Sequence, residues 1–270
     1  MVTHKEYRIC MPVSVEEYRI GQLYLIAKHC HEQSQAGDGV EVIKNEPCED
    51  ETHGKGRYTE KRIHISHRLP TWAKALVSQY LYVEEKAWNY YPFTITEYSC
   101  SLVPLFTVRI QTCYENNSGA TENALCLAAD IVAQREVVHL DIAHDEVDPK
   151  KYKKEEDCRL FQSVKTGRGP LTEKDWKDTC DPVMCSYKLV SATCSIFGLG
   201  GYLESAALAS IKDVLLHGHR QAFCWIDEWI GLSLDDVRAY EQEKQQETNR
   251  KTLGESAESP ATASGASSQV

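Results

Sequence analysis

The sequence predicts an α+β fold in which a curved antiparallel sheet packs against long helices. Three observations carry this prediction. Short segments of alternating apolar and polar residues recur between residues 5 and 194, as half-buried strands require. One segment of helical periodicity follows the first strand, and two more close the chain. Runs of consecutive strands beside separate helices are typical of an α+β layer fold.

The N-terminal part begins with a strand at residues 5–11, which Pro12 ends. Ser14 and Glu17 then have capping-box spacing, which predicts a helix from this point to about His31. Alternating segments at 40–43 and 57–65, separated by a charged turn that contains glycine, predict a hairpin.

The middle of the chain is organised around residues 86–98, which hold five aromatic side chains among β-branched residues. This composition favours two strands, and Pro92 marks the break between them because proline cannot donate to a ladder. Asn89, Thr94 and Thr96 would give the pair a polar surface suited to one end of a binding cavity. An ordinary aromatic core strand is the alternative, and this stretch alone favours it.

The remaining elements follow the same patterns. Pro70 opens a short amphipathic helix at 70–77. Further strands are predicted at 106–112, 135–142 and 184–194, and helices at 199–224 and from Ser233 to about Arg250. Residues 145–181 form a long charged connection, a length that is usually functional or mobile. We therefore expect one domain at 1–252 and a disordered tail rich in Ser and Ala at 253–270.

Composition excludes several classes of protein. The 270 residues carry a net charge of -10, which leaves no basic surface for nucleic acid. No run approaches the roughly 20 apolar residues that span a bilayer, and the N-terminus lacks a signal-peptide core. The 11 cysteines are odd in number and scattered, which predicts thiols rather than disulfides or a zinc site. We expect a cytoplasmic protein without metal or cofactor.

Candidate catalytic motifs are weak. The glycine-rich segments 167–170 and 198–201 match no nucleotide-binding fingerprint. Asp141, His144 and Asp145 could join one of many Ser or Cys residues in a hydrolase triad, but nothing places a nucleophile in an elbow. A hydrolase therefore remains a weak alternative.

Several longer motifs resemble the phosphatidylinositol transfer proteins. They lie in order along nearly the whole chain: Lys5-Glu6-Tyr7-Arg8, Glu16-Glu17-Tyr18-Arg19-Ile20-Gly21-Gln22, Asn45-Glu46-Pro47, Gly56-Arg57-Tyr58-Thr59-Glu60-Lys61, Glu85-Lys86-Ala87-Trp88-Asn89, Ser163-Val164-Lys165-Thr166-Gly167-Arg168-Gly169-Pro170, Met184-Cys185-Ser186-Tyr187-Lys188 and His219-Arg220-Gln221-Ala222-Phe223.

The resemblance implies a START-like fold, in which a concave sheet and long helices enclose one phospholipid. Within the family, segments 9–12, 31–34, 94–98 and 218–220 look like the soluble, single-domain retinal-degeneration-B type, class II. Class II membership implies phosphatidylinositol and phosphatidic acid as cargo, exchanged between membranes without catalysis. A module that presents or senses the same lipid for a partner is the second hypothesis, and a hydrolase acting on lipid is the third and least favoured.

The resemblance also implies roles for individual residues. The headgroup contacts map onto Thr59, Lys61, Asn89, Lys188 and Glu241. The phosphate and glycerol end maps onto Gln22, Thr96, Thr112 and Cys185.

Membrane docking is expected to be transient and to use Ile196 and Phe197, which stand where class I members carry tandem tryptophans, together with Trp72 in the 70–77 helix. Ser163 matches a phosphorylatable serine of the family. The Ser-rich tail would bind a phosphoserine adaptor, and the protein is expected to be a monomer.

Overall fold

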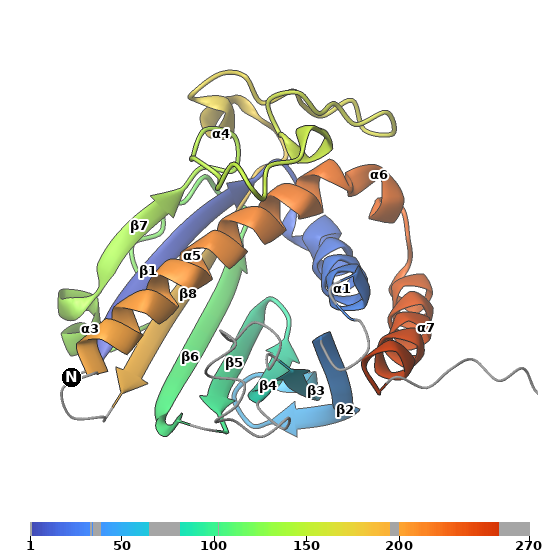
Figure 1. Cartoon of the computed structure of the whole chain (residues 1–270). Helices are drawn as coiled ribbons and strands as arrows, with labels where there is room; N and C mark the ends of the chain where they lie inside the picture. Colours follow the sequence, from blue (N-terminus) through green and yellow to red (C-terminus); the bar gives the residue numbers. More distant parts are fainter. Residues whose placement is uncertain are drawn as a thin grey trace, which may run out of the picture.

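A computed structural model of the chain describes residues 2–32, Ser34, 39–64, 82–101, 103–194 and 200–253. In this part of the chain, an eight-stranded sheet with long helices on its concave side forms the fold (Figure 1). The strands are β1 (Thr3–Met11), β2 (Gly39–Asp50), β3 (Gly54–His64), β4 (Tyr82–Tyr90), β5 (Phe93–Cys100), β6 (Val103–Glu115), β7 (Glu136–Leu140) and β8 (Met184–Cys194). The helices are α1 (Val15–Glu32), α3 (Ala129–Gln134), η2 (Lys154–Glu156), α4 (Trp176–Thr179), α5 (Gly200–Cys224), α6 (Ile226–Trp229) and α7 (Leu234–Leu253).

The sheet has the strand order β2-β3-β4-β5-β6-β8-β1-β7. The strands from β2 to β6 are neighbours in sequence and pair antiparallel, as the hairpin patterns predict. The expectation of a wholly antiparallel sheet is wrong at one edge, where β7 pairs parallel with β1. This arrangement is possible because β7 follows the long connection after β6 rather than a tight turn.

Local sequence signals set several boundaries. The Ser14 hydroxyl accepts a hydrogen bond from the Glu17 amide, and the Glu17 carboxylate accepts one from the Ser14 amide, so the predicted capping box begins α1. Ser233 and Asp236 make the same reciprocal pair before α7. The turn at Tyr91 and Pro92 separates β4 from β5, as the proline predicts.

Helices α1, α5 and α7 lie on one side of the curved sheet (Figure 1). The long helix α5 crosses the concave face over β1 and β8, and α1 lies beside it. Helix α7 packs against both α1 and β2. The Asn249 side chain joins α7 to β2, because it accepts from the Val42 amide at 2.8 Å and donates to the Val42 carbonyl at 3.0 Å. None of the described helices is long and apolar enough to cross a bilayer.

The outer face of β1 and β8 is closed by the loop after β6. Glu6 is buried there between Arg8 and Arg135, each with Nε 2.7 Å from a Glu6 carboxylate oxygen. The Arg8 guanidinium also donates to the carbonyls of Gly119 and Glu122. This face is therefore sealed by structural contacts, and the opposite, concave face remains for a ligand.

Residues 145–181 contain two short helices, η2 and α4, that the sequence patterns do not predict. Segment 225–230 contains α6, whose Ile226 and Trp229 are buried in the core. The expected helix at 70–77 and the tail from residue 254 lie outside the described residues.

Candidate functional site

A large cavity lies between the concave face of the sheet and helices α1, α5 and α7. It contains about 1720 Å³ of space free of protein atoms, including the solvent at its mouth. The residues that line it come from both the sheet and the three helices, so a bound ligand would contact both layers.

Five neighbouring strands each place one polar residue in the same register across the cavity wall. Arg57 on β3 lies opposite Asn89, which lies opposite Thr94, and Thr94 opposite Thr112, which pairs with Lys188 on β8. All five line the cavity. We call this row the polar rung; a cationic side chain stands at each of its ends.

One end of the polar rung carries a buried cationic side chain. Lys188 is 8 % exposed, and its Nζ donates to the hydroxyl of Thr112, itself 2 % exposed, at 3.2 Å. No carboxylate of the described residues lies within ion-pair distance of Lys188. Burial without such a partner lowers the pKa of Lys188 to about 8.

Gln22 adds a second donor at this end. Its Oε1 accepts from the Tyr114 hydroxyl at 3.2 Å, while its buried Nε2 has no partner among the described atoms. Because buried donors are rarely left unpaired, Gln22 and Lys188 together favour an acceptor-rich ligand such as phosphate.

His219, which no motif in the sequence marks as a site residue, lines the cavity nearby. Its Nδ1 lies 2.7 Å from the Leu215 carbonyl, which can only accept, so Nδ1 carries the proton. Burial, reinforced by the charge of Lys188, lowers the pKa of His219 to about 3. The ring is therefore neutral, and Nε2 is an acceptor for a ligand hydroxyl.

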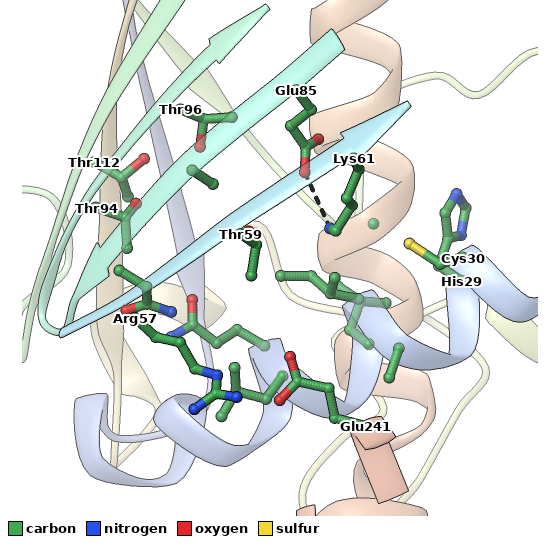
Figure 2. Close-up of a pocket in the computed structure, with 18 of the residues that line it drawn as sticks. His29, Cys30, Arg57, Thr59, Lys61, Glu85, Thr94, Thr96, Thr112 and Glu241 are labelled. Atoms are coloured by element: carbon green, nitrogen blue, oxygen red, sulfur yellow. Dashed lines mark ion pairs between the residues drawn. The ribbon is translucent and has the colours of Figure 1, made fainter. Parts of the chain in front are cut away.

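The neighbouring rungs extend the polar region toward β2 and α7 (Figure 2). Thr59 follows Arg57 on the same face of β3, and Lys61 comes next, since side chains alternate along a strand. Lys61 Nζ lies 3.0 Å from the carboxylate of Glu85 directly across the ladder. Burial disfavours the charged form of Lys61, but the negative charge of Glu85 prevails and raises its pKa.

Helix α7 contributes Glu241 to this region. One carboxylate oxygen of Glu241 accepts from Arg238 and the other from Asn45 Nδ2 at 3.3 Å. Figure 2 shows Glu241 reaching from α7 toward Arg57 and Thr59 of β3. Helix α7 therefore closes the cavity with a polar surface.

Part of the remaining lining is apolar and partly exposed to solvent. Leu25 and Ile26 of α1 and Val214 and Leu215 of α5 belong to it. Ile26 is 42 % exposed and Val214 65 % exposed, although both are large hydrophobic residues. Their exposure places an apolar mouth between these two helices.

The structure thus brings together eight of the predicted lipid contacts: Gln22, Thr59, Lys61, Asn89, Thr96, Thr112, Lys188 and Glu241. The structure corrects the prediction for Cys185, which does not line the cavity. It lies three residues before Lys188 on β8 and so faces the other side of the sheet, where it is fully buried opposite Cys10. Asn89 also has a structural role, because its Oδ1 accepts from the Tyr91 amide at 3.1 Å.

Other candidates fall outside the cavity. The Ser163 hydroxyl is buried and donates to Asp227 at 2.5 Å. In the suggested triad, His144 contacts the Asp141 carboxylate through one nitrogen and the Thr172 carbonyl through the other. No group of three or more His, Cys, Asp or Glu among the described residues could hold a metal ion. The docking candidates Trp72, Ile196 and Phe197 lie outside the described residues.

A cavity with one buried polar end, one apolar mouth and a helical cover defines a carrier of a single amphipathic ligand. Residues 2–246 match the model of the phosphatidylinositol transfer protein family, and the chain belongs to this family. It is 58 % identical over 251 residues to a cytoplasmic phosphatidylinositol transfer protein 1 of Drosophila melanogaster, covering 93 % of this chain and 92 % of that protein. Identity to the human protein of the same description is 52 %, covering 92 % of this chain and 74 % of that one. Phosphatidylinositol transfer protein 2 of Dictyostelium discoideum is 46 % identical, covering 92 % of this chain and 95 % of that protein.

Proposed function

We propose that this protein binds one phosphatidylinositol molecule and exchanges it between membranes without catalysis. The family match supports transfer rather than chemistry. The observation that carries the proposal is the buried Lys188, unpaired with any described carboxylate, at the end of a polar rung inside a cavity with an apolar mouth. A phosphodiester supplies the missing negative charge, and acyl chains suit the apolar lining.

The energetics of lipid extraction favour such a cavity. A phospholipid exposes roughly thirty methylene groups, which at ~0.8 kcal/mol each would cost ~24 kcal/mol in water. A carrier must therefore keep the chains covered and open only at a membrane. Helix α7 is suited to this opening, because polar contacts hold it to β2 and α1 while it covers the cavity.

In the proposed arrangement, the phosphate binds Lys188, Thr112 and Gln22. The inositol ring extends along the polar rung toward Asn89, Thr59, Lys61 and Glu241, with Thr96 on the adjacent wall. These groups supply both donors and acceptors, as ring hydroxyls require. We propose a START-like arrangement and class II specificity, with phosphatidic acid as a second cargo.

We further propose that the protein acts as a cytoplasmic monomer that docks transiently through Ile196, Phe197 and Trp72. Ser163 as a phosphorylation site and an adaptor bound to the tail 253–270 belong to the same hypothesis. Replacing Phe197 by alanine should then weaken membrane binding and vesicle-to-vesicle transfer, and unchanged values for both would disprove the docking assignment.

Mass spectrometry of lipid that co-purifies with the protein tests the main proposal. Intact phosphatidylinositol, released only when acceptor vesicles are added, is the expected result. Binding without transfer would favour the second function, a module that presents or senses the lipid. Cleaved lipid would favour a hydrolase and overturn both.

A further inference from the structure

The polar end of the cavity has an uneven charge balance. Lys61 is neutralised by Glu85, and Arg238 by Glu241. Arg57 lines the same end but has no carboxylate of the described residues within ion-pair distance. Its partner is the neutral side chain of Asn45. Arg57 therefore leaves this end of the cavity with a net positive charge.

The guanidinium of Arg57 is held in one orientation. Its Nε donates to the Asn45 side-chain oxygen and its Nη2 to the Asn45 carbonyl at 3.0 Å. For Nη1 the described residues provide no hydrogen-bond acceptor. Arg57 thus presents a fixed donor to the cavity, at the opposite end of the polar rung from Lys188.

Asn45 connects this guanidinium to the cover of the cavity. Its Nδ2 contacts the carboxylate of Glu241 at 3.3 Å and the Gln245 side-chain oxygen at 3.1 Å. The same amide therefore orients Arg57 through its oxygen and α7 through its nitrogen. Displacement of α7 would break the contacts of Asn45 with Glu241 and Gln245 but leave its hydrogen bonds with Arg57 in place.

We propose that Arg57 is a specificity-determining residue, which donates to hydroxyl oxygens of the inositol ring and disfavours a choline headgroup by charge repulsion. Asn45 is its positioning residue. This inference rests on the proposed function and extends it to the choice among lipids. A ring of hydroxyls offers acceptors to a guanidinium, whereas a quaternary ammonium offers only positive charge. Phosphatidic acid has no group beyond the phosphate and so does not reach Arg57.

Competition within one sample tests the proposal. Wild-type protein, Arg57→Gln and Arg57→Lys are each given vesicles with distinguishable phosphatidylinositol, phosphatidic acid and phosphatidylcholine, and the transferred lipids are quantified together. Because the three lipids compete for the same folded molecules, their ratios are unaffected by any misfolded fraction. Arg109→Gln is the matched control, since Arg109 is exposed on the outer face of β6 and pairs with Glu97.

For Arg57→Gln, the ratio of phosphatidylinositol to phosphatidic acid should fall at least about tenfold, the loss expected for one charge-assisted hydrogen bond. The share of phosphatidylcholine should rise, because the unpaired positive charge is gone. Arg57→Lys should keep phosphatidylcholine excluded while recovering phosphatidylinositol only in part. Arg109→Gln should leave all ratios at the wild-type values.

Unchanged ratios in Arg57→Gln, or an equal loss of every lipid, would overturn the proposal. If wild-type protein carries an inositol lipid with a ring phosphate and Arg57→Gln loses only that lipid, the guanidinium binds a phosphate and the hydroxyl assignment is wrong. Failure of wild-type protein to carry any of the lipids would instead reject the proposed function.

A double-mutant cycle tests the positioning role of Asn45. Asn45→Ala should shift the lipid ratios in the same direction as Arg57→Gln, and the double variant should shift them no further than Arg57→Gln alone. Additive shifts would show that Asn45 acts independently of Arg57 and would refute this part of the proposal.

Discussion

Replacement of Lys188 by methionine separates the stability of this protein from its binding of an anionic lipid. Methionine keeps the length and most of the volume of the side chain but removes the buried charge. In the lipid-free protein, the folded state holds the pKa of Lys188 at about 8, below its ordinary value of 10.5. At about 1.4 kcal/mol per tenfold change in the proton equilibrium, this lowering corresponds to about 3 kcal/mol of destabilisation.

The direction in which stability changes with pH follows from proton binding. Between pH 8 and 10.5 the unfolded chain holds more protons on this lysine than the folded protein does, so stability rises with pH in that window. Below pH 8 the buried charge of Lys188 destabilises the folded state by the full amount, about 3 kcal/mol. Lys188→Met should therefore raise the free energy of unfolding of lipid-free protein at pH 7 by about 3 kcal/mol, and the gain should vanish as the pH approaches 10.5.

Urea unfolding of delipidated protein at pH 7 and pH 10, combined with phosphatidylinositol transfer, measures both effects. Lys188→Met should be more stable at pH 7 and inactive in transfer, and added phosphatidylinositol should stabilise only the wild type. Lys86→Met is the control, because Lys86 lies on the outer face of β4 in an ion pair with Glu84 that is worth about 0–1 kcal/mol. A Lys188→Met variant that is less stable than wild type, or that still transfers phosphatidylinositol, would refute the reasoning.

Four further predictions concern the same site and its cover. Transfer of phosphatidylinositol by wild-type protein should decline as the pH rises above about 8, because Lys188 loses its charge there; a flat profile to pH 10 would contradict this. Thr59→Glu should reduce transfer of phosphatidylinositol more than that of phosphatidic acid, since the added carboxylate faces the ring, and equal loss of both would count against the headgroup assignment. Asn249→Ala removes two hydrogen bonds between α7 and β2, and should lower stability by about 1–3 kcal/mol in urea unfolding while speeding spontaneous lipid release; an unchanged release rate would argue against α7 as the cover. Ser163→Glu places a carboxylate against Asp227 and should lower the melting temperature, whereas Ser163→Ala should change it less.

Much of the fold follows from local signals in the sequence. The capping box at Ser14, the helix start at Ser233 and the strand break at Pro92 act through adjacent residues, and each is found where the pattern predicts it. The parallel pairing of β7 with β1 is not encoded in this way. It depends on how a long connection folds back, and no residue of β7 specifies the direction of its neighbour.

The candidate site also combines features that the local sequence predicts with features that depend on the fold. Alternation along a strand correctly groups Thr59 with Lys61, because residues two apart share a face. The same rule excludes Cys185 once Lys188 is placed in the cavity, since three residues separate them on β8. Arg57 precedes Thr59 by two residues and satisfies the rule, so strand periodicity alone would have found it.

The polar rung is different, because its members come from five strands and no short motif contains them. Each side chain acquires its neighbours only through the register of the ladders, and one slip of register would move it to the outer face. The register in turn depends on apolar residues between the polar ones, such as Ile110 and Val190, which pair across β6 and β8 directly beside Thr112 and Lys188. The apolar pattern therefore decides which polar groups meet, and the buried charge of Lys188 remains a cost of the lipid-free fold until a ligand supplies its partner.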